Sequence, residues 1–275
     1  MKSALGGTRK QVFDKAGEHY ELREVFDAYM RFGGMPGIAD IGDQEKALVL
    51  LEGIYSTVIM RDILERESRR GQKKITDPVL LKKIIMFLAD NIGSNISVSS
   101  IGNTLVNEGL LENGKRKGTP SVHTVQAYVN ALLESYFFYD IKRFDIKGKE
   151  YLRTLGKYYI VDIGLRNYLL GFRDRDSGHA IENIVYFELI RRGYDVSIGK
   201  VGNFEVDFIA TKADNKLYVQ VTESMTSEDV RSRELAPLKK ISDNYEKIVL
   251  SLNTGIDSSY DGIKSINLID WLISE

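Results

Sequence analysis

The sequence predicts an α+β protein with a helical first half and a mixed unit of helices and strands at its C-terminus. Apolar residues recur at three- and four-residue spacing up to about residue 133, which is typical of amphipathic helices. From residue 136 onward, apolar and polar residues alternate in short runs that favour strands. The chain has 275 residues, which exceeds the usual size of one domain. We therefore expect several compact units.

Composition narrows the class of protein. With no cysteine, the chain has no disulfide framework, no thiolate metal site and no cysteine nucleophile. No run of about 18 or more apolar residues occurs, and the N-terminus lacks the apolar core of a signal peptide. We therefore expect a cytoplasmic protein with no membrane partner. Because the formal net charge is −1, contact with nucleic acid requires a local basic patch.

Residues 1–72 are expected to form a helical segment. Apolar residues at positions 22, 25, 26, 29 and 30 share one face of a helix, and Phe32-Gly33-Gly34-Met35-Pro36 ends it. A second helix is expected from about Asp43 through Leu64. The charged run at 61–66 is interpreted as a solvated helix face rather than an interdomain contact.

Residues 73–172 are expected to form a winged-helix domain. Asp77 and Pro78 supply an N-cap and a first helical proline, a short helix follows at 97–105, and a third helix begins at Pro120-Ser121. A strand at 136–144, a turn at 145–149 and a returning strand from Tyr151 predict the hairpin, or wing.

Basic residues predict where this domain contacts DNA. Positive groups at a helix and at a hairpin tip suit phosphate contacts. The candidates are Lys115, Arg116, Lys117, His123, Lys147 and Lys149. The strands of the hairpin add Lys142, Arg143 and Lys157 to this basic group. Winged helices also dock proteins, so a partner protein remains the alternative to DNA.

Residues 173–275 carry the most informative pattern. After Ser177 the expected order is a helix, three strands, a helix and a strand. Glu205 and Asp207 alternate along one strand, Gln220 and Thr222 along the next, and Glu182 lies on the preceding helix. Val206, Phe208, Val219 and Val221 are expected to point into a core.

This pattern predicts a restriction-endonuclease-like domain with a weakened site. Such folds place an Asp on one strand and Glu-x-Lys on the next, because carboxylates hold Mg²⁺ and the lysine helps activate water. Here Gln220 and Thr222 stand in place of the Glu and the Lys. Glu182, Asp207 and Gln220 are the candidate Mg²⁺ ligands, and a neutral amide is a poorer ligand than a carboxylate.

Two functions follow from these residues. The favoured one is a binding module for DNA or protein with a degenerate nuclease-like domain. The alternative is a Mg²⁺-dependent DNA endonuclease that uses Glu182, Asp207 and Gln220, with a lysine from another element replacing the missing one. A zinc site is not expected, because His19, His123 and His179 lie far apart without ligand-spaced partners.

Six motifs carry a family resemblance. They are residues 32–36, 157–167, 181–183, 188–194, 205–208 and 218–221. In this order they resemble the C-terminal part of prokaryotic AAA+ ATPases that end in a restriction-endonuclease-like domain of unknown function, over about residues 20–272. The resemblance implies that residues 1–72 are an ATPase lid-like segment and connector.

The chain departs from that family at its nucleotide site. No phosphate loop of the form Gly-x-x-x-x-Gly-Lys-Ser/Thr occurs. We expect ATP to be bound only by a further N-terminal domain, and this chain to be a C-terminal fragment or a member without its motor. We therefore predict that this chain neither binds ATP tightly nor hydrolyses it.

Overall fold

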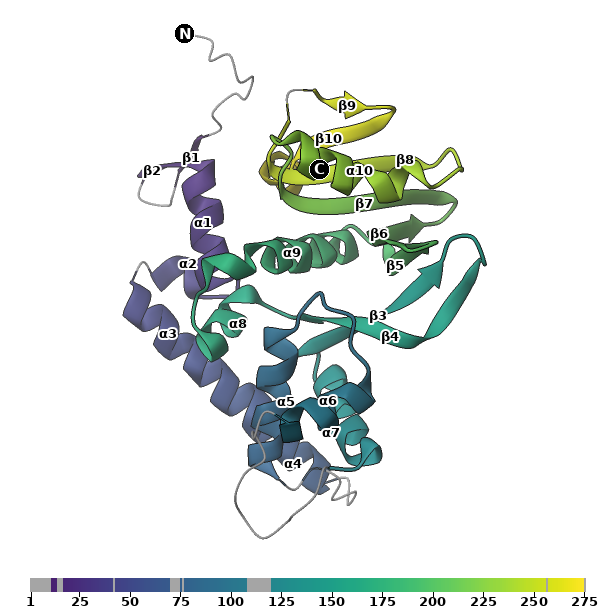
Figure 1. Ribbon diagram of the computed structural model, residues 1–275. Helices are drawn as coiled ribbons and strands as arrows, with labels where there is room; N and C mark the ends of the chain where they lie inside the picture. Colours follow the sequence, from purple (N-terminus) through teal and green to yellow (C-terminus); the bar gives the residue numbers. More distant parts are fainter. Residues whose placement is uncertain are drawn as a thin grey trace.

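The computed structural model describes residues 11–13, 17–41, 43–69, 75, 77–107, 120–255 and 257–274. It combines a helical region with one eight-stranded mixed sheet (Figure 1). The α+β class predicted from the sequence is therefore confirmed. Among the helices of these residues, none is both long and apolar enough to cross a membrane.

The N-terminal region is helical, as expected. The two short strands β1 (Gln11–Phe13) and β2 (His19–Glu21) pair with each other and lead into α1 (Leu22–Phe32). Next come α2 (Ile38–Ile41), α3 (Gln44–Gly53), a π-helical segment (Ile54–Arg61) and α4 (Asp62–Arg69). The helix predicted from Asp43 is thus one continuous helical run with Asp43 as its N-cap.

One residue of the charged run corrects the prediction of a solvated face. Arg66 donates hydrogen bonds of 3.3 Å to the backbone carbonyls of Ala131 and Glu134, at the end of the later helix α7 (Val122–Glu134). A cation favours the unsatisfied carbonyls of a helix C-terminus, which explains the contact. The run therefore joins the N-terminal helices to the middle of the chain.

The middle of the chain has the predicted order of three helices and a hairpin. The helices are α5 (Pro78–Asp90), α6 (Val98–Asn107) and α7, and the strands are β3 (Phe138–Asp145) and β4 (Glu150–Ile160). Asp77 caps α5 and Ser121 caps α7, as their side chains predict. Ile96, in the connection between α5 and α6, forms an antiparallel bridge with Gly156 of β4.

The C-terminal part confirms the predicted order of elements. It contains α8 (Ile163–Leu170), a 3₁₀ turn (Asp174–Asp176), α9 (Ser177–Arg191), β5 (Asp195–Val201), β6 (Phe204–Lys212), β7 (Asn215–Ser224), α10 (Glu228–Lys239) and β8 (Glu246–Asn253). Three further elements follow that the sequence did not predict, namely β9 (Ser259–Tyr260), β10 (Ile263–Asn267) and α11 (Leu268–Ile273).

The hairpin expected as a free wing belongs to the main sheet. The strand order is β4-β3-β5-β6-β7-β8-β10-β9, and β3 pairs in parallel with β5, with Arg143 opposite Ile198. An open strand edge leaves backbone donors and acceptors unpaired, and β5 satisfies those of β3. The sheet therefore continues across the boundary predicted between residues 172 and 173, and the three predicted domain ranges stay predictions.

Two apolar clusters pack on the sheet, and they correct one detail of the predicted alternation. Phe208 belongs to the cluster that includes Ile181 and Val185 of α9, whereas Val206 belongs to the cluster that includes Leu235 of α10. The register between β5 and β6 shifts in this stretch, and an irregular pairing breaks the two-residue alternation of faces. Val221, expected in the core, is only half-buried.

Candidate functional site

A buried lysine lies between two carboxylates at the centre of the candidate site. The ammonium of Lys157 on β4 is 2.8 Å from Oε1 of Glu182 on α9 and 2.8 Å from Oε1 of Glu205 on β6. The lysine side chain is only 4% exposed. The Tyr159 hydroxyl donates to the same oxygen of Glu182, and Nδ2 of Asn95 donates to Oε2 of Glu205 at 2.8 Å. Three distant segments thus meet around one ammonium.

Packing explains how these groups reach each other. Lys157 and Tyr159 are two residues apart on a strand, so their side chains share one face of the sheet. The ring of Tyr159 stacks on Tyr186 of α9, with centroids 4.9 Å apart and planes at 19°. Four residues before Tyr186, which is about one helical turn, Glu182 faces the same strand.

Two further predicted site residues, Asp207 and Gln220, lie where β6 and β7 stop pairing. The ladder between these strands ends at the pair Phe208 and Val219. Beyond it, Oδ2 of Asp207 accepts a hydrogen bond of 2.8 Å from the Val221 amide. The side-chain oxygen of Gln220 accepts a long hydrogen bond of 3.4 Å from the Asp207 amide. Both side chains therefore bind backbone groups that the ladder leaves unpaired.

The amide nitrogen of Gln220 extends this network toward α10. Nε2 of Gln220 donates to Oε2 of Glu234 at 3.2 Å. Glu234 also forms an ion pair of 2.9 Å with Arg233. Thr222, the remaining predicted site residue, is half-buried on β7 opposite Ser251 of β8.

Burial and charge set the protonation of the cluster. Burial would lower the pKa of Lys157, but the charges of Glu182, Asp207 and Glu205 raise it above its usual value. Burial would raise the pKa of Glu205, but Lys157 and the hydrogen bond from Asn95 hold it below its usual value. Lys157 and Glu205 are therefore charged at neutral pH.

The pKa of Asp207 shifts in the opposite direction to that of Glu205. Burial first, and then the charge of Glu182, raise the pKa of Asp207 well above its usual value, although Lys157 and the Val221 amide act in the other direction. Burial and the charge of Glu182 also raise the pKa of the Tyr159 hydroxyl, which stays protonated and donates to Glu182.

The three side chains predicted to hold Mg²⁺ are directed at three different partners. Glu182 binds Lys157, Gln220 binds Glu234, and Asp207 binds the Val221 amide. Within the described ranges, no three Asp, Glu or His side chains converge closely enough to hold a metal ion. In this arrangement Glu182, Asp207 and Gln220 do not aim their oxygens at one common point, which is what binding of Mg²⁺ by all three would require.

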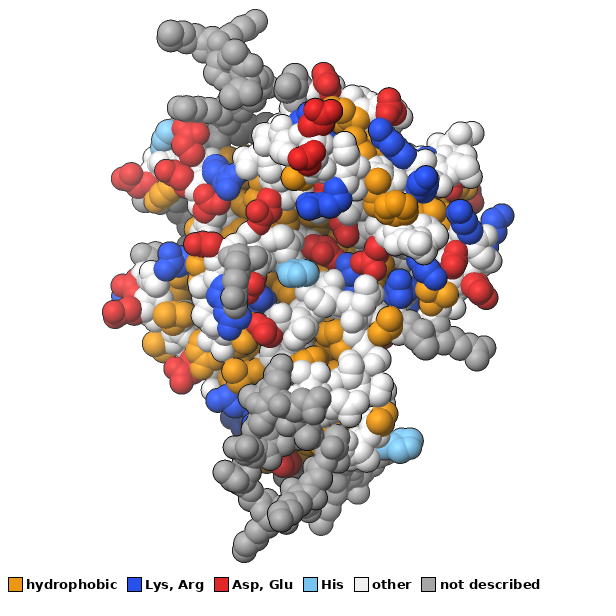
Figure 2. Space-filling model, in the orientation of Figure 1, with side chains coloured by type: hydrophobic (Ala, Val, Ile, Leu, Met, Phe, Trp, Pro, Cys, Tyr) orange, Lys and Arg blue, Asp and Glu red, His pale blue; other side chains and the backbone are white. Residues whose placement is uncertain are grey.

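Two of the predicted DNA contacts lie at the far end of the hairpin, and a third lies on α7. Lys147 and Lys149 are exposed in the turn between β3 and β4, and His123 is exposed in the first turn of α7. Asp145 accepts hydrogen bonds of 3.0 and 2.9 Å from the amides of Lys147 and Gly148, which fixes the turn. Figure 2 shows Lys and Arg side chains interspersed with acidic ones on the side where this hairpin tip lies. Lys115, Arg116 and Lys117 lie outside the described residues.

Sequence reasoning missed the residue at the centre of the site. Lys157 was grouped with the basic surface of the hairpin, but it is buried and ion-paired. The available signal was the spacing of Lys157 and Tyr159, which places a cation and a hydroxyl on one strand face. Asn95 and Glu234 carried no comparable signal, because their partners lie 110 and 14 residues away along the chain.

Comparisons with known proteins identify relatives. The family model of a domain of unknown function, DUF8612, matches residues 23–176. An uncharacterized protein of Haemophilus influenzae is 37% identical over 250 residues, which cover 91% of this chain and 58% of that protein. An uncharacterized protein of Methanocaldococcus jannaschii is 29% identical over 228 residues, or 81% of this chain and 47% of that protein. The chain thus spans about half the length of the curated relatives it matches.

Proposed function

This chain belongs to the DUF8612 family of domains of unknown function. From its geometry we propose that it is a DNA-binding module, in which the nuclease-like cluster of Lys157, Glu182 and Glu205 has a structural rather than a catalytic role. The fold context we propose is the C-terminal part of an AAA+ ATPase-family protein, with a winged helix and a restriction-endonuclease-like domain. ATP would then be bound by a different domain.

The position of Lys157 carries the proposal. Metal-assisted hydrolysis of a phosphodiester needs free carboxylates that gather a divalent cation, and a group that activates water. Here the ammonium of Lys157 lies 2.8 Å from both Glu182 and Glu205, and it supplies the positive charge that a metal ion would otherwise bring. Mg²⁺ binds tightly only to oxygen ligands in near-octahedral geometry, so it would have to displace a buried ion-paired lysine.

The middle of the chain supports DNA as the partner. The order α5, α6, α7 and hairpin resembles that of a winged helix, and Ile96 forms an isolated antiparallel bridge with Gly156 of the hairpin. The outer face of α7 presents Gln126 and Asn130, side chains whose amides pair with adenine edges in a major groove. Lys147 and Lys149 at the hairpin tip suit phosphate contacts.

One observation favours the alternative, a Mg²⁺-dependent endonuclease. That function requires a lysine from another element, and Lys157 lies beside Glu182 and Glu205, with its charge acting on Asp207. If the lysine moves away from the carboxylates when DNA binds, Glu182, Glu205 and Asp207 become free to gather a cation. The same protein sample tests both functions.

Binding is measured by fluorescence anisotropy with a labelled duplex at about 50 and about 200 mM salt. We expect affinity to fall steeply with salt, because cationic contacts release counterions from DNA. The double variant Lys147→Glu/Lys149→Glu should bind more weakly and with a smaller salt slope. Its control is Lys46→Glu/Lys240→Glu, which makes the same charge change at exposed positions on α3 and after α10. Absent binding, or equal loss in both variants, contradicts a DNA contact at the hairpin.

Cleavage is assayed on linear, single-stranded and branched DNA in Mg²⁺ and in Mn²⁺. We expect no metal-dependent product. Cleavage that is lost in Asp207→Ala would instead establish the endonuclease function and make Asp207 part of its active site.

A further inference from the structure

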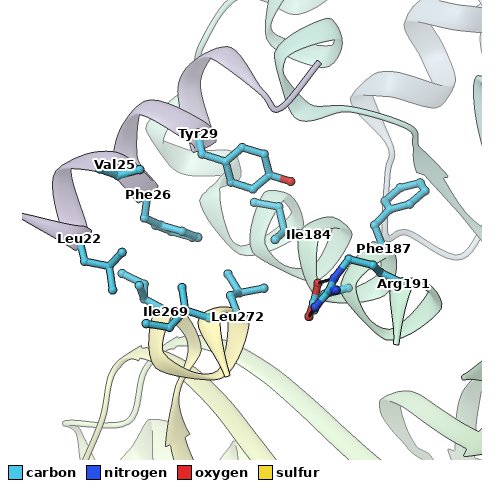
Figure 3. A pocket seen from close by; sticks show the side chains of 11 residues that line it. Leu22, Val25, Phe26, Tyr29, Ile184, Phe187, Arg191, Ile269 and Leu272 are labelled. Atoms are coloured by element: carbon cyan, nitrogen blue, oxygen red, sulfur yellow. Dashed lines mark hydrogen bonds and ion pairs between the residues drawn. The ribbon is translucent and has the colours of Figure 1, made fainter. Parts of the chain in front are cut away.

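The surface has an apolar hollow and a polar helix face, and the two differ in what they can recognise. The hollow, of about 510 Å³, lies between α1, α9 and α11 (Figure 3). Its lining is mostly apolar, and its two charged side chains, Glu188 and Arg191, already pair with each other at 2.7 Å. Recognition of a base pair requires free hydrogen-bond donors and acceptors. The outer face of α7 offers them, whereas this hollow is poor in them.

The outer face of α7 is accessible and carries no negative charge until its last position. The helix packs on the core through Val125, Tyr128, Val129, Ala131 and Leu132. Its opposite face presents Val122, His123, Gln126 and Asn130, of which His123 and Asn130 are exposed and Gln126 is half-buried. Positions 123, 126 and 130 are three and four residues apart, so they form one stripe. The one acidic residue of α7 is Glu134, at its C-terminal end. The stripe can therefore approach the phosphates that line a groove.

A hydrogen bond fixes the orientation of the Asn130 amide. Nε2 of Gln126 donates to Oδ1 of Asn130 at 2.7 Å. An amide oxygen can accept two hydrogen bonds, and an amide nitrogen can donate two. Beyond this bond, the Asn130 amide can therefore still accept one hydrogen bond and donate two. The bond also determines which end of the amide is the oxygen, because only the oxygen can accept from Gln126.

The free acceptor and donors of Asn130 match one base. In the major groove, which admits an α-helix, adenine presents the acceptor N7 beside the donor N6, and an asparagine amide pairs with both. We propose that α7 reads an A·T base pair in duplex DNA, with Asn130 donating to N7 and accepting from N6 of the adenine. Gln126 is a positioning residue that holds the Asn130 amide in the required orientation. This inference rests on the proposed DNA-binding function and adds the base pair that the module selects.

The test is selection from a pool of duplexes with a randomised central segment. The intact chain is mixed with the pool at about 50 mM salt, where phosphate contacts are strong, and bound DNA is recovered and sequenced. We expect enrichment of sites with a fixed A·T pair. Replacing that pair by G·C should weaken binding between about 5-fold and about 150-fold, the range for a bidentate base contact. Asn130→Ala should remove this preference and change affinity for unselected DNA by less than about threefold, because phosphate contacts dominate that affinity.

A change in the base tests the same contact from the DNA side. Duplexes in which 7-deazaadenine replaces the selected adenine lack N7, so they should bind the unsubstituted protein more weakly but bind Asn130→Ala as well as the parent duplex does. Gln126→Ala should reduce the A·T preference without abolishing it, because Asn130 is still present but no longer held. Gln44→Ala is the matched control, since it removes an exposed amide on α3, and it should keep the full preference.

The outcomes separate this inference from the function on which it rests. DNA binding without an enriched base pair, or an A·T preference that survives Asn130→Ala, overturns base reading by α7 and leaves the DNA-binding function in place. Equal loss of the preference in Gln44→Ala also overturns it. Absence of binding to every duplex overturns both the inference and the proposed function.

Discussion

Lys157 donates a 2.8 Å hydrogen bond to Glu182 across 25 positions of sequence, and this buried ion pair joins the edge strand β4 to helix α9. Glu205 on β6 completes the contact from the other side. Replacing a whole buried ion pair by apolar groups is often neutral, whereas removing one partner leaves an uncompensated charge. The cluster therefore responds very differently to different substitutions, and this difference distinguishes a structural role from a catalytic one.

The substitution Lys157→Met should destabilise the protein by about 3–5 kcal/mol, because it leaves buried carboxylates without a counter-charge. We further expect Mn²⁺ or Ca²⁺ to restore part of this loss, since a divalent cation would replace the ammonium. Urea denaturation with and without the cation measures both effects. Lys264→Met is the control, because Lys264 is 60% exposed in its pair with Glu246 and should cost less than about 1 kcal/mol. Equal stabilisation of the unsubstituted protein by the cation would show that the cluster already binds metal.

The raised pKa of Asp207 predicts a direction of pH dependence. A carboxyl whose pKa is higher in the folded than in the unfolded state binds more protons when folded, so stability falls as pH rises above the usual value of 3.8. Asp207→Asn removes this fall, because the amide oxygen still accepts from the Val221 amide but never ionises. The variant should therefore gain stability relative to the unsubstituted protein as pH rises from about 4 to about 8.

The exposed carboxyl of Asp261 is the control, because its pKa is shifted in the opposite direction and its effect on stability should therefore have the opposite dependence on pH. The hydrogen bond and charge of Lys239 hold the pKa of Asp261 below its usual value, so its contribution is present above 3.8 and is lost as pH falls through the lowered pKa. Asp261→Asn should thus lose relative stability at neutral pH and not in acid. If Asp207→Asn showed this same trend, Asp207 would be an ordinary ionised partner of Lys157.

A glycine after α1 should be required for the docking of that helix. Gly33 ends α1 with φ of 77°, and a Cβ there would lie 2.0 Å from the Asp162 carboxylate and 2.6 Å from the Gly164 amide nitrogen. Gly171 ends α8 with a nearly identical φ of 78° but has nothing within 4 Å of such a Cβ. Both glycines combine this positive φ with an extended ψ, a region essentially restricted to glycine, so alanine at either site costs about 1–3 kcal/mol in backbone strain and the comparison isolates the steric part.

We expect Gly33→Ala to lose at least about 2 kcal/mol more than Gly171→Ala, because backbone atoms cannot yield as a flexible side chain can. Equilibrium unfolding measures the difference. Equal losses would mean that α1 moves away from α8 at little cost, and the Gly34 amide would then also lose its hydrogen bond of 2.7 Å to Asp162.

Local chemistry explains which parts of the fold could be predicted from the sequence. Asp77 and Ser121 each cap a helix whose start was predicted, because an N-cap side chain binds an amide only two or three residues ahead. Glu182, Asp207 and Gln220 were chosen as candidate site residues from strand alternation and helix position, which are also local patterns, and their role stays a prediction.

Long-range pairing explains what could not be predicted. The parallel pairing of β3 with β5 joins Arg143 to Ile198, and nothing in either segment specifies a partner so far away. Lys157 reached its place through this pairing, since the hairpin becomes part of the sheet whose neighbours carry Glu205 and Glu182. A basic strand residue on a free wing would face solvent, whereas the same residue on this sheet is buried.

Asn183 should prove essential because it closes the edge of β4 beside Glu182. Its side-chain oxygen accepts a hydrogen bond of 2.9 Å from the Ile160 amide, and its nitrogen donates one of 2.9 Å to the Ile160 carbonyl. The amide thus takes the place of a further strand, and Asn183 is only 1% exposed. Asn183→Ala would leave two buried backbone groups unpaired, at about 1–3 kcal/mol each.

We therefore expect Asn183→Ala to lose about 2–5 kcal/mol in urea denaturation, and Asn183→Asp to lose a large part of it, since a carboxylate accepts but cannot donate. Asn130→Ala, at an exposed position of α7, should change stability by less than about 0.5 kcal/mol. Because Asn183 fixes the turn of α9 that carries Glu182, its loss should also expose Lys157, measurable as faster modification of its amine by an acylating reagent. Lost stability without faster modification would show that the ion pair positions itself, independently of the Asn183 contact.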